Sequence, residues 1–522
     1  MRHWIKWQVE GDLPKKPDAI VLILHRLSNH RCRSCCKHKK TTIRKRYPAM
    51  PKIVIGLKEG ISIEETPGGG VELKSAYIAQ TLSKTTPGTV KALLMLAAGG
   101  STQEELEDMA RAEDWFLSNL PQYIEQLARL GFLTWSVLED GQSLARLVVI
   151  GQGFNFHLSE IGSDQRFVLS RFAYSRCLNQ KTVLETPLQP VRLELDGWLG
   201  MALWGLLSRP ATYPELCAAI PGADSAIVKL LLQLFAAAGM IQPADEAEGG
   251  IPEDRDVVLR LWEFHDLLFH TRTRDGRQDQ PLGATFRFWP GIEPLPACKP
   301  SMQGELIELA KPNLEHLIEE DYPFTLVLEE RHSIRDYAPE AITLQQIGEF
   351  LYRAARVKGI RPADPERGAM YEASARPYPG GGACHELEIY LTVGECRGLD
   401  RGLYHYDPLG HSLTKLCSEN RCTGLILKQA EGSAAKQCQA QVVINLTARF
   451  PRLSWKYNSI AYALMLKDVG ALYQTMYLVA TAMDLAPCAL GAGHADWLCQ
   501  AAGLNYLAES PVGEFLLGSK RI

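Results

Sequence analysis

A helical plan that occurs twice is the feature that most constrains how this chain of 522 residues can fold. In each copy a helix is followed by a second helix that begins with a capping-box spacing, and then by a longer helix that ends at a glycine. The residues that carry the plan are Ser101, Glu104 and Gly131 in the first copy, and Thr212, Glu215 and Gly239 in the second. Strand-like residues follow each glycine, so we predict winged-helix-like modules at 52–150 and 151–250.

The two predicted modules lack the charge that DNA-binding winged helices need. Their third helices, near 120–130 and 223–238, contain few Lys or Arg residues that could neutralise phosphates. The whole chain has 56 basic and 60 acidic residues, a net charge of −4, so no global field attracts nucleic acid. We therefore interpret the modules as binding peptides or proteins; the alternative is that they only pack against the rest of the chain.

Length and composition bound the class of protein. The chain is too long for one core, because a domain holds roughly 150 residues. Its apolar stretches are shorter than the ~18–20 residues of a membrane span, so we expect a soluble protein without a membrane partner. Its 13 cysteines are an odd number and no cleavable signal pattern is evident, which favours reduced thiols and a cytoplasmic location.

The segment 1–51 is much richer in Lys and Arg than in acidic residues. Cys32 and Cys35 have the spacing of half a zinc site, but no second pair follows at finger spacing. We interpret the segment as a solvated basic arm, with a metal site or contact with an acidic partner as alternatives. A mis-assigned start codon explains it as well as a function does.

The remaining chain divides into a connecting segment, 251–310, and a mixed domain, 311–522. The connecting segment begins acidic and later becomes rich in Pro and aromatic residues, which predicts a linker followed by an extended strap. In the mixed domain, helical and strand patterns alternate, which predicts an α+β fold with a central sheet flanked by helices. The segments concerned are a helix capped by Thr343 and Gln346, strands at 388–393, 441–446 and 514–517, and a long apolar helix at 459–484.

Three motifs in the mixed domain suit a flat ligand that carries a phosphate. Arg331, Ser333 and Arg335 place two guanidinium groups four residues apart around a hydroxyl, so both can converge on one phosphate. A surface charge pair explains this spacing about as well. Three consecutive glycines at 380–382 permit close backbone approach to a ring. The GxG at 491–493 follows a helix and is informative only in combination with the others.

The order of these motifs resembles the FMN-dependent nitroreductase fold over about 311–522. With the aromatic and histidine-containing run 262–270 and the two helical modules, the chain resembles more narrowly the SagB-type dehydrogenases. These are the azoline oxidases of thiazole- and oxazole-modified peptide biosynthesis. The resemblance covers most of the chain after residue 52. It implies a nitroreductase-like FMN-binding C-terminal domain preceded by two winged-helix-like peptide-clamp modules.

The resemblance also implies which residues bind FMN. They are Arg331, Ser333, Arg335, Lys520 and Arg521 for the phosphate and ribityl chain, Pro379, Gly380, Gly381 and Gly382 for the isoalloxazine, and Gly491 for the edge that carries the flavin N5. This chain has Gly380 where the family often has Ser.

Lys456 and Tyr457 stand where azoline dehydrogenases carry a catalytic Lys–Tyr pair. From the residues alone, Lys456 could equally be a surface lysine whose stem lies along Trp455. Oxidising an azoline to an azole removes a proton from one ring carbon and a hydride from its neighbour, so the reaction needs a base. A lysine with a lowered pKa, or a tyrosinate beside a lysine, could take that proton.

The activity implied is oxidation of peptide thiazolines or oxazolines to thiazoles or oxazoles, with O₂ reoxidising the flavin and no metal ion. The implied partner is an azoline-containing precursor peptide, whose leader the modules would bind and so concentrate the core at the flavin. A cyclodehydratase is a further candidate partner. In this family FMN lies at a dimer interface, so the apolar helix 459–484 suggests a homodimer.

Two other functions compete with this one. A general NAD(P)H-dependent FMN nitro- or quinone reductase would use the same domain but leave the N-terminal 250 residues without a purpose. A non-catalytic peptide-binding scaffold would have lost its flavin chemistry. The presence of both Arg331 and Arg335, and of both Lys456 and Tyr457, argues against such a loss.

Overall fold

The computed structural model describes residues 50–67, 69–75, 79–83, 85–111, 120–244, 251–435 and 439–521. It divides the chain into two compact units, Met1–Ala49 and Met50–Ile522, of which only the second contains described residues. The Cys32–Cys35 pair lies outside the described residues, so the interpretation of the basic segment stays a prediction.

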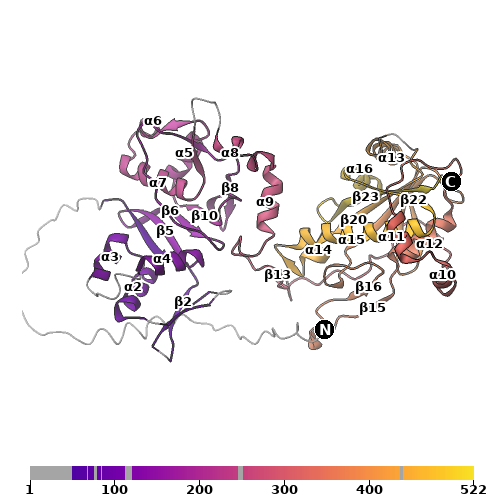
Figure 1. The fold of residues 1–522 in the computed structure, drawn as a ribbon, viewed down its shortest axis with the longest axis horizontal. Helices are drawn as coiled ribbons and strands as arrows, with labels where there is room; N and C mark the ends of the chain where they lie inside the picture. The colour runs from indigo at the N-terminus through magenta and orange to yellow at the C-terminus, as the bar shows by residue number, and fades with distance from the viewer. Residues whose placement is uncertain are drawn as a thin grey trace, which may run out of the picture. The chain divides into compact units, whose positions relative to one another are not determined.

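The two N-terminal modules share one six-stranded antiparallel sheet (Figure 1). In spatial order its strands are β1 (Lys52–Leu57), β5 (Leu133–Glu139), β6 (Gln142–Val149), β10 (Val191–Leu195), β9 (Lys181–Glu185) and β8 (Tyr174–Leu178). The first module provides the first three strands and the second module provides the last three. The modules join where β6 pairs with β10, with Val149 opposite Val191.

The first module has the predicted three helices and a strand hairpin, β5–β6, as its wing. Its other elements are β2 (Ser62–Glu65), β3 (Val71–Lys74), β4 (Ala79–Leu82), α2 (Pro87–Ala97), α3 (Gln103–Arg111) and α4 (Leu120–Arg129). The predicted capping box is wrong by one residue, because Thr102 and Glu105 form it. The Glu105 amide donates to Thr102 Oγ1 (3.1 Å) and the Thr102 amide donates to Glu105 Oε2 (2.9 Å). Ser101 adds a hydroxyl bond to the same carboxylate.

The second module repeats this plan with three helices and a small sheet in the order β11-β7-β12. Its elements are β7 (Arg166–Leu169), α5 (Trp198–Leu206), β11 (Ala211–Thr212), α6 (Tyr213–Ala219), α7 (Ser225–Ala237) and β12 (Ile241–Pro243). Thr212 and Glu215 form the predicted capping box. Gly239 follows α7 with φ +70°, the left-handed conformation that ends many helices and that glycine adopts without strain.

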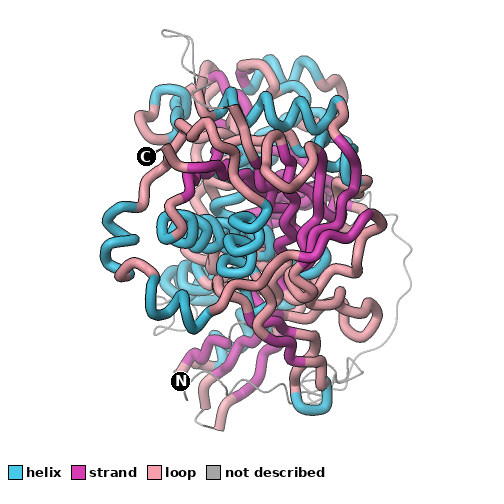
Figure 2. The backbone as a smooth tube through the Cα atoms, turned by 90° about the vertical axis from the view of Figure 1, so that its right-hand side faces the viewer, coloured by secondary structure: helices cyan, strands magenta, loops and turns pink. Residues whose placement is uncertain are grey.

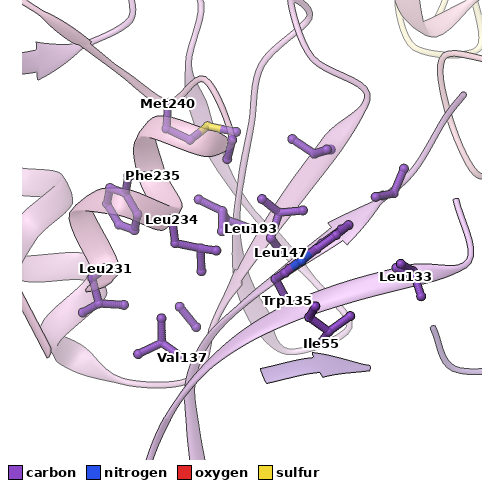
Figure 3. Packing of buried hydrophobic residues seen from close by; sticks show 14 of the residues in the cluster. Ile55, Leu133, Trp135, Val137, Leu147, Leu193, Leu231, Leu234, Phe235 and Met240 are labelled. Atoms are coloured by element: carbon purple, nitrogen blue, oxygen red, sulfur yellow. The ribbon is translucent and has the colours of Figure 1, made fainter. Parts of the chain in front are cut away.

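One hydrophobic core joins the two modules (Figure 3). Trp135 and Leu147 come from the first module, and Leu193 and Phe235 come from the second. All four side chains are buried in the same cluster. Because apolar surface from both modules is removed from water together, the modules support each other's folding.

The connecting segment is mostly irregular. Its elements are α8 (Pro252–Arg255), the 3₁₀ helix η2 (Leu259–Leu261), α9 (Phe264–Arg272), β13 (Gly283–Ala284) and β14 (Glu305–Glu308). β14 pairs with β19 and so becomes the edge strand of the C-terminal sheet.

The C-terminal domain is built on a seven-stranded antiparallel sheet (Figure 1). In spatial order its strands are β14, β19 (Ser412–Ser418), β18 (Gly402–Asp407), β17 (Leu387–Val393), β20 (Val442–Arg449), β23 (Glu509–Ser519) and β22 (Leu485–Leu490). β23 is much longer than the predicted 514–517. The strand extends to both sides of the predicted one, where Pro511 and Gly513 on one side and Gly518 on the other interrupt the apolar residues.

Helices cover both faces of this sheet (Figure 2). Phe515 and Leu517 of β23 belong to the core beneath α12 (Leu344–Ala355) and α15 (Ala461–Ala482). Leu516, between them, belongs to the core on the opposite face, because successive strand residues point to opposite sides. That opposite core contains residues of α13 (Arg421–Ser433) and α16 (Ala495–Ala502). The predicted α+β class, a central sheet flanked by helices, is confirmed.

Shorter elements complete the domain. They are α10 (Leu314–Glu320), α11 (Phe324–Glu330), β15 (Gly359–Arg361), η3 (Pro365–Arg367), β16 (Ala373–Ala375), η4 (Gly381–Ala383), α14 (Phe450–Ser454) and β21 (Tyr457–Asn458). Thr343 and Gln346 form the capping box predicted for α12. Among the helices of the described residues, none combines the length and apolar character needed to cross a membrane.

Candidate active site

The glycine loop and the Lys–Tyr pair, far apart in sequence, are in contact. Gly382 has φ +59°, and a Cβ built on it would lie 2.0 Å from Lys456 Nζ and 2.6 Å from Tyr457 Oη. Those distances are far inside van der Waals contact, so only glycine leaves room for the lysine amine here. Two motifs that the sequence suggested separately therefore form one site.

The glycine loop is held from two sides. The Gly381 amide donates to Asp468 Oδ2 on α15 (2.7 Å), and the Gly382 carbonyl accepts from Tyr371 Oη (2.6 Å). A Cβ on Gly380 would lie 2.8 Å from His385 Nδ1, so a side chain at this position would displace the imidazole. Pro379 precedes these glycines and is exposed.

Lys456 is buried, with 8% of its surface exposed. Its Nζ donates to Tyr371 Oη, and it faces the rings of Tyr371 and Tyr457 at 4.6 and 4.8 Å from their centroids. Burial is the largest influence and lowers the pKa of Lys456, because desolvation disfavours the ammonium form. The nearby Cys384 thiol acts in the opposite direction, and the Arg452 guanidinium lowers this pKa further.

Tyr457 has the opposite tendency. Burial, followed by the charges of Cys384 and Asp468, raises its pKa to about 12. Its hydroxyl therefore stays protonated at neutral pH. Of the two bases that the sequence left open, the neutral Lys456 amine fits this environment and the tyrosinate does not.

The strap between β13 and residue 297 packs directly on the lysine segment. The amides of Thr285 and Phe286 both donate to the Lys456 carbonyl, at 3.0 and 3.2 Å. β13 pairs with β21, which follows the lysine immediately. The Trp455 indole donates to the Ile292 carbonyl at 2.6 Å. The connecting segment therefore fixes the backbone from which Lys456 projects.

Two buried carboxyl groups lie behind the glycine loop. Burial, reinforced by the charge of Asp468, raises the pKa of Glu386. Burial also raises the pKa of Asp468, but the Gly381 amide bond acts in the opposite direction. Glu386 is therefore the partner that holds a proton, which leaves Asp468 able to accept from Gly381.

The segment 331–335 lies against β22 and the C-terminal half of α15. The Ser333 hydroxyl bonds to Tyr477 Oη (2.7 Å), and the Arg331 guanidinium lies over the Tyr477 ring, 5.3 Å from its centroid. The Ile334 amide donates to the Pro487 carbonyl at 2.8 Å. Within the described part of the chain, neither Arg331 nor Arg335 forms an ion pair with a carboxylate.

Lys520 and Arg521 lie beside this segment, because Tyr337 forms a β-bridge with Lys520. Arg521 donates to the Tyr337 carbonyl at 3.2 Å. Both cations are paired, however: Lys520 with Asp484 (3.2 Å) and Arg521 with Asp336 (3.1 Å). They are near the predicted phosphate position, but their charge is shared with these carboxylates.

Gly491 follows β22 and is exposed, and a Cβ built on it would meet nothing within 4 Å. Asp468 of α15 contacts the glycine loop, and Tyr477 of the same helix contacts the arginine motif. At about 1.5 Å of rise per residue these positions are roughly 13 Å apart along the helix. The predicted cofactor residues thus form two groups separated along α15.

The two groups fit FMN, which has a flat ring at one end of its ribityl chain and a phosphate at the other. The arginine motif offers two guanidinium groups without a carboxylate partner among the described residues, as a phosphate requires. The glycine loop offers backbone without side chains, beside a buried amine, as a flat ring requires.

Sequence reasoning missed three residues of the site. Tyr371 and Asp468 hold the glycine loop, and Phe286 holds the Lys456 carbonyl. Asp468 carried one signal: it is an acidic residue in an otherwise apolar stretch of α15, and it is buried. Tyr371 and Phe286 carried no signal, because their neighbours in sequence form no motif.

Three family models match successive parts of the chain. A helix-turn-helix domain of the ThcOx type matches residues 50–158, the cyanobactin oxidase ThcOx matches 167–279, and the nitroreductase family matches 328–519. The fold and these matches define an oxidoreductase with a nitroreductase-like domain. These successive matches confirm the predicted resemblance to the SagB-type, nitroreductase-like dehydrogenases.

Curated relatives each match part of the chain. “Putative nitroreductase MJ1384” of Methanocaldococcus jannaschii is 28% identical over 36% of this chain and 86% of its own length. The trifolitoxin-processing protein TfxB of Rhizobium leguminosarum is 30% identical over 22% of this chain, and the microcin B17-processing protein McbC of Escherichia coli is 27% identical over 21%. The chain spans 32% of the length of TfxB and 42% of that of McbC.

Replacing Gly382 by Ala should destabilise the protein and displace the Lys456 amine. The φ of +59° strains any residue with a Cβ, so we expect the free energy of unfolding to fall by about 1–2 kcal/mol in urea titrations. Gly491→Ala is the matched control, because its φ is not positive and its Cβ meets nothing, and it should cause no loss. Equal losses in the two variants would show that the tight contact at Gly382 is not required.

Proposed function

We propose that this protein is an FMN-dependent dehydrogenase that oxidises peptide thiazolines or oxazolines to thiazoles or oxazoles during the biosynthesis of a ribosomal peptide natural product. The observation that carries the proposal is the contact between the buried Lys456 amine and the backbone of Gly382. It combines a base with a surface for a flat ring in one place.

The proposed reaction removes two hydrogens from one ring of the peptide. A carbon of the azoline loses a proton and its neighbour loses a hydride, so the product is 2 Da lighter per ring, on the order of two hydrogen masses. The neutral Lys456 amine takes the proton, since burial favours that form. When bound, FMN supplies the hydride acceptor, and O₂ is the proposed oxidant that regenerates it.

Other residues orient the parts around this base. Asp468 and Tyr371 hold the loop 380–382 in the left-handed turn that exposes its backbone. Arg331 and Arg335 would hold the phosphate, with Ser333 fixed against Tyr477 between them. Phosphate binding at a distance from the lysine fixes the cofactor without using the groups that take part in proton transfer.

The N-terminal modules are proposed to bind the leader of the precursor peptide. Similarity to two proteins named for processing trifolitoxin and microcin B17 supports a peptide substrate. The strands β5 and β6 of the first wing both lie inside the shared sheet, so they have no free edge. In the described residues β8 pairs with β9 alone, and a leader strand could add to its outer edge. A cyclodehydratase that supplies azolines is a candidate partner.

A general NAD(P)H-dependent nitro- or quinone reductase is the second candidate. Similarity to “Putative nitroreductase MJ1384” over most of that protein's length favours it. That similarity covers 36% of this chain, and a general reductase would leave the two modules without a role. NAD(P)H oxidation in the presence of quinones, without any change in an azoline peptide, would favour this function.

In this proposal the protein acts as a homodimer. Ile318 of α10 and Phe324 of α11 are 83% and 66% exposed, although both are large and apolar. They lie on the two helices that lead directly into the arginine motif at 331. Exposed apolar surface of this kind is typical of subunit interfaces, and a second copy would cover it beside the proposed phosphate position.

Light scattering during size-exclusion chromatography tests the dimer. We expect twice the chain mass of 58.1 kDa, and we expect the double variant Ile318→Glu, Phe324→Glu to shift toward the single mass. Leu261→Glu is the control, because Leu261 is 79% exposed but lies on η2 in the connecting segment. A wild-type protein with the mass of one chain would contradict the proposal.

Lys456→Ala should abolish most azoline oxidation. Mass spectrometry of an azoline peptide should show the 2 Da loss with the wild type and a rate lower by roughly 10²–10⁴-fold with the variant. Because the base must be neutral and its pKa is lowered from 10.5, the wild-type rate should rise with pH and have its midpoint below that value.

Lys428→Ala is the matched control, since Lys428 is an exposed lysine of α13 on the opposite face of the sheet. It should leave both the rate and its pH dependence unchanged. Full mass loss by Lys456→Ala would exclude Lys456 as the base, whereas no loss with wild-type protein that contains flavin would contradict azoline oxidation itself.

A further inference from the structure

The Tyr371 hydroxyl lies between the Lys456 amine and the glycine loop. Tyr371 Oη donates to the Gly382 carbonyl at 2.6 Å and accepts from Lys456 Nζ. A phenol has one proton to donate, and here the carbonyl takes it. The oxygen therefore presents only lone pairs to Lys456, which fixes the direction of the second bond: the amine donates.

Packing holds the Tyr371 ring in this position. The ring centroids of Phe286 and Trp455 both lie 6.4 Å from it, and the Arg452 guanidinium lies 5.6 Å away. Arg452 is itself held, because it donates to the Glu372 carbonyl at 2.5 Å and to the Cys384 carbonyl at 3.1 Å. Tyr371 is 9% exposed, so its hydroxyl has little freedom to leave the amine.

Tyr457 offers a comparison within the same site. Its ring lies 4.8 Å from Lys456 Nζ, nearly the same distance as the Tyr371 ring at 4.6 Å. Both rings can therefore stabilise an ammonium group through their faces. Within the described residues, however, only the Tyr371 hydroxyl is hydrogen-bonded to Nζ. The bond to Nζ therefore distinguishes the two tyrosines, which makes them separable by experiment.

We propose that Tyr371 is a positioning residue for Lys456, and that its hydroxyl bond to Nζ and to the Gly382 carbonyl aims the amine at the substrate ring. The proposal rests on the proposed function, because it explains how the amine of the proposed base Lys456 is oriented. Tyr457 supplies a ring face to the same amine and does not aim it.

The direction of the hydrogen bond explains how the amine is oriented. A neutral amine has two hydrogens and one lone pair, and the lone pair must face the carbon that loses its proton. When one N–H of the Lys456 amine is donated to Tyr371, most rotations of the amine are excluded. The lone pair is then confined to the remaining tetrahedral positions. Correct orientation of a catalytic group contributes to rate without any change in its chemistry.

The same bond also affects the charged form of Lys456. The Tyr371 oxygen accepts from an ammonium more strongly than from an amine, so it favours protonation and opposes the effect of burial. The other groups that act on this amine are the Cys384 thiol, the Arg452 and Arg361 guanidinium groups and the Tyr457 ring, and they stay in place when the Tyr371 hydroxyl is removed.

The test compares Tyr371→Phe with Tyr457→Phe in the full-length flavoprotein. Competitive acetylation with acetic anhydride at a series of pH values, read by peptide mass spectrometry, measures the pKa of Lys456 without any turnover. We expect Tyr371→Phe to lower it by about one pH unit, since a hydrogen bond to a charged group is lost, and Tyr457→Phe to leave it unchanged. The acidic limb of the rate profile should move by the same amount.

Reaction rates distinguish a role in orienting the Lys456 amine from a purely structural role of Tyr371. Tyr371→Phe should lower the plateau rate by about tenfold while the KM for the azoline peptide stays the same. 3-Fluorotyrosine at position 371 keeps the shape of the side chain and its fold, and it makes the oxygen a weaker acceptor. It should therefore lower the pKa of Lys456 in the same direction by a smaller amount.

Two results would overturn the proposal. One is an unchanged Lys456 pKa in both the Tyr371→Phe and the 3-fluorotyrosine proteins; the other is an equal change in Tyr457→Phe. The acetylation experiment requires no azoline substrate. Failure of the proposed function would leave its outcome intact, and the two failures can be told apart.

Discussion

The contact between the Lys456 amine and the backbone of Gly382 is the constraint on which the rest of the site depends. A single methyl group on residue 382 would overlap Nζ, and the left-handed φ of +59° disfavours any residue with a Cβ, so glycine leaves the amine where it lies. The amine is buried beneath the rings of Tyr371 and Tyr457 as well. The low-dielectric surroundings in turn favour the neutral lysine, which is the form able to accept a proton.

Several segments that are far apart in the sequence hold the two sides of this contact in place. Asp468 of α15 and Tyr371 hold the loop, and the strap residues Thr285 and Phe286 hold the carbonyl of Lys456. The strap begins just after Asp279, which bonds to Lys58 and Arg192 of the two N-terminal modules. One continuous stretch of chain therefore connects the proposed peptide-binding modules with the backbone of the proposed base.

Features with a local cause were predictable from the sequence. The capping boxes at Thr212 and Thr343 and the left-handed Gly239 follow from residues within one helical turn of each other. The first capping box was misplaced because Ser101 and Thr102 both have a Glu at capping-box spacing, and the β-bridge between Ser101 and Ile55 leaves Thr102 as the cap. The length of β23 was underestimated because Pro511 and Gly513, residue types that are rare inside strands, precede its apolar residues.

Features with a distant cause were not predictable in the same way. Lys456 alone is compatible with a surface lysine, and only the fold brings Gly382 and Tyr371 around its amine. The resemblance to known dehydrogenases identified Lys456 and the glycines, but it gave no reason to single out Tyr371 or Asp468. Contacts across more than 80 residues are set by sheet topology, which short motifs do not encode.

Anaerobic mixing of the purified flavoprotein with an azoline-containing peptide tests the central claim most directly. If the site oxidises azolines, the yellow absorption of the flavin should bleach as the peptide becomes 2 Da lighter, and O₂ should restore the colour. If NAD(P)H bleaches the flavin while the azoline peptide leaves both the colour and its own mass unchanged, the account is contradicted and the protein is a general reductase.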